Sequence, residues 1–261
     1  MSILGQIVKY KQRELESSMR KKPMEKLQKE ATRLPKTRSR FYQALKKSKK
    51  IAVIAEIKKR SPSKGILRKD FKPVEIARAY EAAGASALSI LTDENFFGGS
   101  ISIFKKIRAI TQLPLLRKDF TIHKYQIYES KLIGADAVLL IADILSSAEL
   151  KNLSVIAGRL GMDVLFEVHN LVDIEKVALL KPKIIGINNR DLHTFQVDLN
   201  ATERLIKRIP AGAIVISESG IQTSEDLKYL KSLGVKAALV GESLMKEKDP
   251  GSALLRLRAG A

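Results

Sequence analysis

The chain has 261 residues, of which 45% are hydrophobic and 29% are charged, and this composition excludes a chain that is disordered throughout. It contains no cysteine, which excludes disulfide bonds, cysteine zinc sites and a cysteine nucleophile. The net charge is +19, and 12 of these charges arise in the first 50 residues, which hold 16 basic and four acidic side chains. Such an excess favours anionic partners: nucleic acid, anionic lipid or an acidic substrate.

Membrane, export and metal-binding signals are weak. The longest clear apolar run, Ala137–Ala142, has six residues, far fewer than the ~20 that span a bilayer. The N-terminus lacks the apolar core of a secretory signal, so we expect a cytoplasmic location. The three histidines, His123, His169 and His193, are spaced unlike a metal site and are interpreted as surface or capping groups.

The first part of the chain predicts basic helices. Apolar residues from Ile3 to Met19 form an imperfect helical stripe, and Pro23 and Pro35 interrupt the pattern. Phe41 and Leu45 then indicate a further short helix. We therefore expect two or three basic helices that lie against something larger.

From residue 51 onward, apolar runs alternate with helical patterns. Runs of this length without polar alternation are typical of parallel strands buried on both faces. The eight runs are Ile51–Ile57, Ala87–Leu91, Leu115–Leu116, Ala137–Ala142, Val164–Val168, Ile184–Ile187, Ile214–Ile216 and Ala237–Val240. Most of the helical patterns end at a glycine or just before a proline, which are expected stop signals. They are Val74–Ala83, Ile101–Ile110, Lys124–Ile133, Ser147–Leu160, Leu171–Leu180, Ala201–Ile209, Ser224–Leu233 and Ala253–Arg258.

Eight alternating units predict an α/β fold of the (β/α)8 TIM-barrel type. We expect residues 1–261 to form a single domain, in which residues 1–48 are a basic helical extension. The alternative is an open doubly wound sheet. Two observations argue against it: no G-x-G-x-x-G motif follows the first strand, and eight nearly equal units suit a closed barrel better.

Active sites of such barrels lie at the C-terminal ends of the strands, so the polar residues there are the candidates. Glu56 and Lys58 are two residues apart and share one face of the first strand. Lys118 and Glu167 lie at the ends of apolar runs, where a charge is costly unless it is paired or binds a ligand. Side chains of opposite charge in one confined mouth shift each other's pKa values, which suits acid–base chemistry. The alternative is a purely structural ion-pair network that also includes Glu218.

The last two strand ends indicate a phosphate. Gly220 and Gly241 follow the seventh and eighth predicted strands, where barrel loops often bind phosphate through backbone N–H groups and a helix N-terminus. The alternative is that both glycines only close tight turns. In the same way, Asn188 is a possible turn residue, and Phe97 and Phe120 are possible loop anchors.

Six segments at these strand ends resemble one family. AEIKKRSPSKG, LRKDF, FEVHN, IGINNRDL, SESGI and LVGESLM, in this order, are similar to the motifs of indole-3-glycerol phosphate synthase. The similarity covers the whole chain, including the basic extension. It implies conversion of 1-(o-carboxyphenylamino)-1-deoxyribulose 5-phosphate to indole-3-glycerol phosphate with loss of CO₂ and water. The resemblance implies no metal and no organic cofactor.

The resemblance also implies residue roles. Lys118 corresponds to the principal general acid, and Glu167 to the carboxylate that acts as general base or in the dehydration step. Glu56 and Lys58 correspond to a supporting pair, with Lys58 near the substrate carboxylate and available as a second acid. The remaining positions are the substrate contacts Asn188 and Arg190, the polar pair Glu218 and Ser219, the ring-flanking Phe97 and Phe120, and the phosphate site Ser61, Gly220, Gly241 and Glu242.

Two further expectations follow from the resemblance, one for position 242 and one for the N-terminal extension. Position 242 departs from family members that carry Ser or Thr, so we expect the Glu242 backbone N–H to contact phosphate while its side chain turns away. The family's N-terminal extension lies beside the catalytic end and helps to cover the substrate. We therefore expect deletion of residues 1–45 to raise KM and to leave a folded barrel.

Two other functions compete with this interpretation. Another phosphate-binding barrel enzyme, such as phosphoribosylanthranilate isomerase or the tryptophan synthase α subunit, leaves the KDF and AEIKKRSPS segments unexplained. A nucleic-acid-binding protein would use the basic arm, but the arm has only Tyr10, Phe41 and Tyr42 as stacking platforms. We therefore expect a small phosphorylated substrate, no specific nucleic acid, no membrane and no obligate protein partner.

Overall fold

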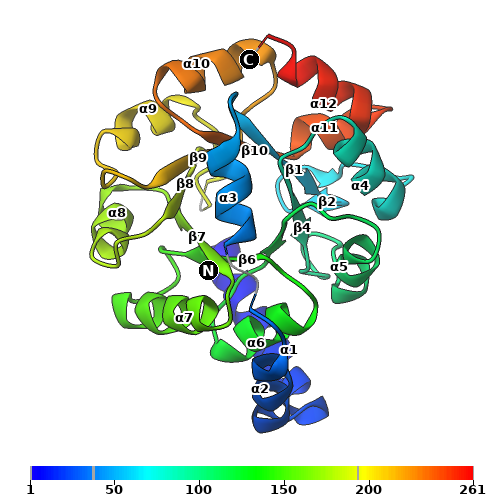
Figure 1. Cartoon of the computed structure of the whole chain (residues 1–261), viewed down its shortest axis with the longest axis vertical. Coiled ribbons are helices and arrows are strands. Elements are labelled where there is room, and N and C mark those ends of the chain that lie inside the picture. Colours follow the sequence, from blue (N-terminus) through cyan, green and yellow to red (C-terminus); the bar gives the residue numbers. More distant parts are fainter. Residues whose placement is uncertain (1, 37–38, 193, 261) are drawn as a thin grey trace.

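The computed structural model of the chain describes residues 2–36, 39–192 and 194–260. Eight parallel strands close into a barrel in the order β1-β10-β9-β8-β7-β6-β5-β4, with helices around it (Figure 1). The strands are β1 (Ala52–Ile57), β4 (Ala87–Leu91), β5 (Leu115–Lys118), β6 (Ala137–Ile141), β7 (Asp163–Val168), β8 (Ile184–Asn188), β9 (Ile214–Glu218) and β10 (Ala237–Val240). The predicted (β/α)8 barrel is confirmed.

Closure explains why these strands are almost wholly apolar. Every residue of β1 is buried, because one face points into the barrel and the other packs under helices. The ring closes on β1, which pairs with β4 through Ile54 and Ala87 and with β10 through Ala52 and Ala237. The alternative of an open sheet is therefore wrong.

The outer helices lie where the apolar patterns predicted them, within a few residues at each end. They are α4 (Pro73–Ala82), α5 (Ile101–Arg108), α6 (Lys124–Leu132), α7 (Ser147–Arg159), α8 (Leu171–Ala178), α9 (Asn200–Ile206), α10 (Ser224–Ser232) and α12 (Pro250–Arg258). Two elements were not predicted, because both are too short for a periodic pattern. They are the helix α11 (Glu242–Lys246) and the hairpin of β2 (Arg60–Ser61) and β3 (Gly65–Ile66).

The N-terminal extension consists of α1 (Ile3–Lys21), α2 (Met24–Arg33) and α3 (Arg40–Lys47), and it passes from one end of the barrel to the other. α1 lies at the C-terminal ends of the strands, where the edge of the Tyr10 ring meets Phe96 at 5.8 Å between ring centroids. α2 packs against α6 on the outside of the barrel (Figure 1).

α3 lies across the opposite end, over the centre of the ring of strands (Figure 1). Phe41 is fully buried and joins the interior cluster of the barrel. The Tyr42 backbone N–H donates to the carboxylate of Asp163 at the start of β7 (2.9 Å), and Arg40 pairs with Asp136 just before β6 (3.0 Å). The expectation that the extension lies at the catalytic end is therefore correct for α1 and wrong for α3.

This path has two consequences. Deletion of residues 1–45 would remove Phe41 and Leu45 from the barrel interior, so it would not leave the barrel intact. We infer that the whole chain forms one domain, because the extension shares the hydrophobic core of the barrel at both ends. Among the described residues, no helix has the length and apolarity that crossing a membrane requires.

Candidate active site

A cavity of about 460 Å³ opens at the C-terminal ends of the strands, and its walls contain all the site residues predicted from the sequence. They are Glu56, Lys58, Ser61, Phe97, Lys118, Phe120, Glu167, Asn188, Arg190, Glu218, Ser219, Gly220, Gly241 and Glu242. These positions span nearly 190 residues of the chain, and closure of the barrel brings them together.

Lys118 lies at the centre of the charged groups. Its Nζ, on the last residue of β5, is 2.5 Å from Glu167 Oε2 at β7 and 2.6 Å from Glu218 Oε2 at β9. Both carboxylate side chains are 2% exposed, so they are almost completely removed from water. One ammonium therefore pairs with two buried carboxyl groups, so the cluster is one positive charge short if both are ionised.

The two carboxylates titrate differently because of this shortage. Burial opposes the charged form of Glu167, but Lys118, His169 and a hydrogen bond from Asn188 outweigh burial and hold the Glu167 pKa well below its usual range. For Glu218, burial and the charge of Glu167 outweigh the attraction of Lys118 and raise the pKa well above the usual range. The pKa of Lys118 is raised, since its carboxylate neighbours outweigh burial. The favoured state pairs a charged Lys118 with a charged Glu167 and leaves a proton on Glu218.

Glu218 also has a free oxygen. Its Oε1 is buried and has no hydrogen-bond partner among the described residues. This oxygen lies over Gly186 of β8, where an added Cβ would be 2.1 Å away. Gly186, which the sequence analysis did not single out, therefore makes space for the Glu218 side chain.

Asn188 and His169 flank Glu167. Asn188 Nδ2 donates to Glu167 Oε1 (3.1 Å), and Asn188 Oδ1 accepts from the Arg190 backbone N–H (3.1 Å). His169 Nε2 is 3.4 Å from the same Glu167 oxygen. The interpretation of His169 as a surface or capping group is therefore wrong: its side chain is 12% exposed and lies beside the Glu167 carboxylate, and Asn170 caps the following helix. The place of His169 two residues after Glu167 is the sequence signal that could have found it.

His123 lies at the N-terminus of a helix and outside the lining of the cavity. His123 caps α6, since its Nδ1 accepts from the Tyr125 backbone N–H (3.2 Å), as predicted. His193 lies outside the described residues. Within residues 2–36, 39–192 and 194–260, no three His, Asp or Glu side chains are grouped as ligands of a metal ion would be.

Glu56 and Lys58 form the predicted pair. Lys58 Nζ is 2.6 Å from Glu56 Oε1, and the Glu56 side chain is 6% exposed. Glu56 packs against Gly241, where an added Cβ would lie 2.6 Å from its Oε1. A glycine at 241 therefore does more than close a turn, because it lets β1 and the loop after β10 approach each other.

The wall beyond this pair is rich in basic and small polar groups. Ser61 Oγ is buried and has no hydrogen-bond partner among the described residues. Arg190 donates to Ser63 Oγ (3.2 Å) and pairs with Glu242 (2.9 Å), and Lys246 pairs with Glu242 at 2.7 Å. Ser63 and Lys246 were missed by the sequence analysis, although Lys246 follows Glu242 by one helical turn.

One expectation about this wall needs correction. The Glu242 side chain does not turn away, but stays in the wall between two cations, and its pKa is lowered because they outweigh partial burial. The expected contact between a phosphate and the Glu242 backbone N–H, at the first residue of the five-residue helix α11, stays a prediction.

Ser219 and Gly220 make an unusual turn into the cavity. Ser219 has a φ of 67° and Gly220 a φ of 81°, so both occupy the left-handed region. This conformation costs a non-glycine residue about 1–3 kcal/mol and is concentrated at functional sites. The turn follows Glu218 directly, and both of its residues line the cavity.

Phe97 and Phe120 stand side by side at one wall. Their ring centroids are 5.9 Å apart, and the planes are inclined by 35°. They come from the loops after β4 and β5, and Leu91 and Ile141 lie nearby in the same wall. The lining of the cavity therefore includes an aromatic pair as well as basic side chains and the Lys118 cluster.

The comparisons with known proteins agree on one family. The family model described as indole-3-glycerol phosphate synthase matches residues 4–257. A protein of Acetivibrio thermocellus with that name is 51% identical over 219 residues, which is 84% of each chain. Another, of Polaromonas naphthalenivorans, is 47% identical over 258 residues and covers 98% of both chains.

Solved structures support the fold alone. A 3-hexulose-6-phosphate synthase aligns with a TM-score of 0.64 at 15% identity, over 80% of this chain and 98% of that one. The enzyme of the same name from Salmonella typhimurium gives 0.64 at 12% identity, over 80% and 97%. The family rests instead on the curated relatives and on the family model, which spans all the strand ends that line the cavity. The chain belongs to the indole-3-glycerol phosphate synthase family.

Proposed function

We propose that the chain closes the indole ring of indole-3-glycerol phosphate, with Lys118 as the principal general acid. The substrate is 1-(o-carboxyphenylamino)-1-deoxyribulose 5-phosphate, and CO₂ and water are released. The observation that carries the assignment of roles is the position of Lys118 Nζ between two buried carboxylates at the centre of the cavity.

Ring closure needs a proton at the ribulose carbonyl oxygen while the aromatic ring attacks the carbonyl carbon. Lys118 supplies this proton, and the charged carboxylate of Glu167 keeps it protonated until then. Loss of CO₂ then restores electrons to the ring. The carboxylate that leaves lies near Lys58, between Glu56 and the apolar wall, where its charge is positioned but poorly solvated.

Dehydration needs an acid at the remaining hydroxyl and a base for the ring proton. Glu167, oriented by Asn188, is proposed as the base. Glu218 holds a proton at neutral pH and, with Ser219 beside it, faces the same space. Lys58 is the second acid that the pocket offers. No metal or organic cofactor is required by this sequence of steps.

The lining of the cavity suits both the anthranilate ring and the phosphate of the substrate. Phe97 and Phe120 are proposed to flank the anthranilate ring. The phosphate is proposed to be held by Ser61, Gly220, Gly241 and the Glu242 backbone, because the unpartnered Ser61 hydroxyl and the basic wall suit an anion. Arg190 is proposed to contact the substrate beside the phosphate. All of these groups come from one chain, so the proposal needs no obligate protein partner. Nor does it need a nucleic acid or a membrane, and a cytoplasmic location suits it.

The test is an assay of indole fluorescence with the carboxyphenylamino-deoxyribulose phosphate. The protein contains no Trp, so the background emission is low. Wild type is expected to produce indole emission, and Lys118→Ala is expected to lower kcat by about 10²–10⁴-fold, as for loss of a general acid. Lys58→Ala serves as the matched control and should lower kcat less.

Each other outcome is informative. Comparable turnover by wild type and folded Lys118→Ala would move the acid role to Lys58. No emission from folded wild type would reject the reaction, and the isomerase and the synthase α-subunit reactions would be tested next.

A further inference from the structure

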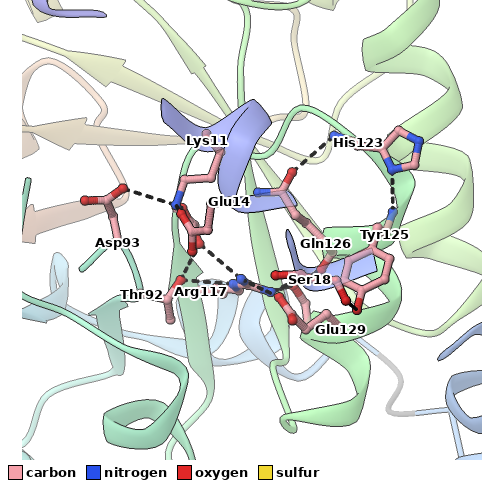
Figure 2. A network of polar contacts seen from close by, with 12 residues as sticks. Lys11, Glu14, Ser18, Thr92, Asp93, Arg117, His123, Tyr125, Gln126 and Glu129 are labelled. Carbon is pink, nitrogen blue, oxygen red and sulfur yellow. Dashed lines mark hydrogen bonds and ion pairs between the residues drawn. The ribbon is translucent and has the colours of Figure 1, made fainter. Parts of the chain in front are cut away.

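The first helix, α1, places a lysine in the buried wall behind the active site. Lys11 is 2% exposed, and its Nζ is 2.9 Å from Asp119 Oδ1, 3.1 Å from Asp93 Oδ2 and 2.7 Å from Glu14 Oε2 (Figure 2). Burial of a charged side chain is costly unless good partners compensate for lost water. Most of the basic residues of the extension that the structure describes are exposed, so Lys11 differs from them in its buried position.

Asp119 connects Lys11 to the catalytic strand. It directly follows Lys118, and its Oδ1 accepts from the Phe120 backbone N–H (2.8 Å). Its Oδ2 accepts from Thr92 Oγ1 (2.6 Å) and from Arg117 (3.1 Å). The Asp119 carboxylate therefore fixes the backbone between Lys118 and Phe120 against the end of β4.

Asp93 connects Lys11 to the neighbouring loop. Its side chain is fully buried, and its Oδ1 accepts from the Phe96 backbone N–H (2.7 Å). This contact shapes the loop after β4 that carries Phe97. Among the ion pairs of the described residues, Lys11 is the single cation that meets Asp93. Asp119, in contrast, has a second cation, because it also pairs with Arg117. Figure 2 shows that Arg117 pairs with Glu129 as well.

We propose that Lys11 is a positioning residue, which clamps the loops after β4 and β5 together so that Lys118, Phe97 and Phe120 keep the geometry of the reaction. This inference rests on the proposed function of Lys118. Lys11 itself lines no part of the cavity, so it acts through Asp93 and Asp119 and touches no substrate. Without its ammonium, two buried carboxylates repel each other across these loops.

A displacement of a catalytic group by about 1 Å lowers the rate by about 10²-fold. We therefore expect Lys11→Met, which keeps the length of the side chain and removes its charge, to lower kcat by about 10- to 100-fold, with a smaller rise in KM. If α1 only covered the substrate, KM would rise and kcat would stay. That second result would overturn the proposal.

Tyr125→Phe is the matched control for docking of α1. Tyr125 Oη donates to the backbone carbonyls of Ser18 and Lys22 at the far end of α1, both at 3.1 Å, and does not touch Asp93 or Asp119. We expect Tyr125→Phe to change kcat by less than threefold. An equal loss of kcat in both variants would overturn the proposal, because general loosening of the helix would then explain the effect.

The absence of cysteine allows a chemical rescue at this position. Lys11→Cys introduces the one thiol of the chain, and aminoethylation with 2-bromoethylamine in urea, followed by refolding, restores an ammonium at nearly the same length. Recovery of kcat after aminoethylation, but not after carbamidomethylation, supports the proposal. Mass spectrometry confirms a single adduct, and wild type taken through the same steps controls for refolding. A folded, aminoethylated protein that stays as slow as the carbamidomethylated one overturns it.

Hydrogen exchange separates this inference from the proposed reaction. In Lys11→Met, the segment 115–122 should exchange faster than in wild type, because the Phe120 amide loses its fixed acceptor, whereas Tyr125→Phe should match wild type there. Unchanged exchange in Lys11→Met would overturn the positioning role even if the enzyme is active. If Lys11→Met exchanges faster than wild type as expected, but wild type makes no indole product, then the proposed function alone is rejected.

Discussion

The two ends of the barrel are both closed by the N-terminal extension, but by different physical means. At the C-terminal end, α1 pairs Lys11 with the buried carboxylates of Asp93 and Asp119 beside the cavity. At the opposite end, α3 inserts Phe41 and Leu45 into an apolar cluster. Catalysis needs buried charges and an open cavity, which reduce stability, and the filled end compensates for this loss. One end of the barrel is therefore expected to control turnover, and the other to control stability.

The sharpest test of this division is a crossed pair of variants. Phe41→Ala should lower the free energy of unfolding by about 3–5 kcal/mol, because it leaves a cavity in a fully buried cluster. The kcat of its folded fraction should stay within about twofold of wild type. Lys118→Ala should show the opposite, with turnover lost and a much smaller change in stability.

Urea unfolding and the indole assay, applied to the same preparations, measure both quantities. A loss of kcat in folded Phe41→Ala would break the comparison, since it would mean that the filled end also sets the geometry of the mouth.

The second test uses pH and the Glu218 carboxyl. Burial and the charge of Glu167 raise the Glu218 pKa from 4.5 to about 8, so between these values the folded chain holds a proton that the unfolded chain has lost. The free energy of unfolding should therefore fall as the pH rises from about 5 to about 8. In Glu218→Gln this fall should be smaller, whereas Phe41→Ala should keep the wild-type slope.

Urea titrations at pH 5, 6.5 and 8 give the slopes for the three proteins. Parallel curves for wild type and Glu218→Gln would show that Glu218 does not hold the proton and that the charge at the mouth is shared differently.

The smallest expected effect concerns the basic wall. Lys246 is half-exposed, so its charge near the proposed phosphate site is worth about 0.5–1 kcal/mol. Lys246→Met should raise KM by about two- to fivefold at low salt and leave kcat unchanged. Lys183→Met, at the opposite end beside Tyr42, is the matched control and should change neither constant.

Steady-state assays at low and high salt measure this difference. The rise in KM should shrink with salt, because screening weakens exposed charges. An equal change in both lysine variants would indicate a general effect of net charge and not a local phosphate contact.

Much of the fold and of the site could be predicted from local patterns. The apolar run Ala87–Leu91, for example, coincides with strand β4. A glycine such as Gly134, with a φ of 85°, marks the end of a helix. Polar residues at strand ends are local signals as well, since any parallel barrel gathers them at one mouth. This is why Lys118, Glu167 and Glu218 were found without knowledge of which partners they choose.

Lys11 shows the limit of what can be predicted from local sequence patterns. It follows Leu4 and Ile7 on the apolar stripe of α1, so its charge on a buried face was a visible anomaly. Its partners Asp93 and Asp119, however, are more than 80 residues away in the chain. The sequence alone predicted a basic helix that lies against something larger, and the structure adds that Lys11 enters a buried ion-pair network.

The sequence by itself determined the eight alternating units, the family and the residue types at the mouth, because these depend on short-range periodicity and on motifs. Only the tertiary structure decided that α3 fills the far end, that His169 flanks Glu167 and that one ammonium serves two carboxylates. These features depend on pairs such as Lys118 and Glu218, 100 residues apart, and only barrel closure sets the distances between such groups. The protonation of Glu218 and the burial of Lys11 follow from those distances.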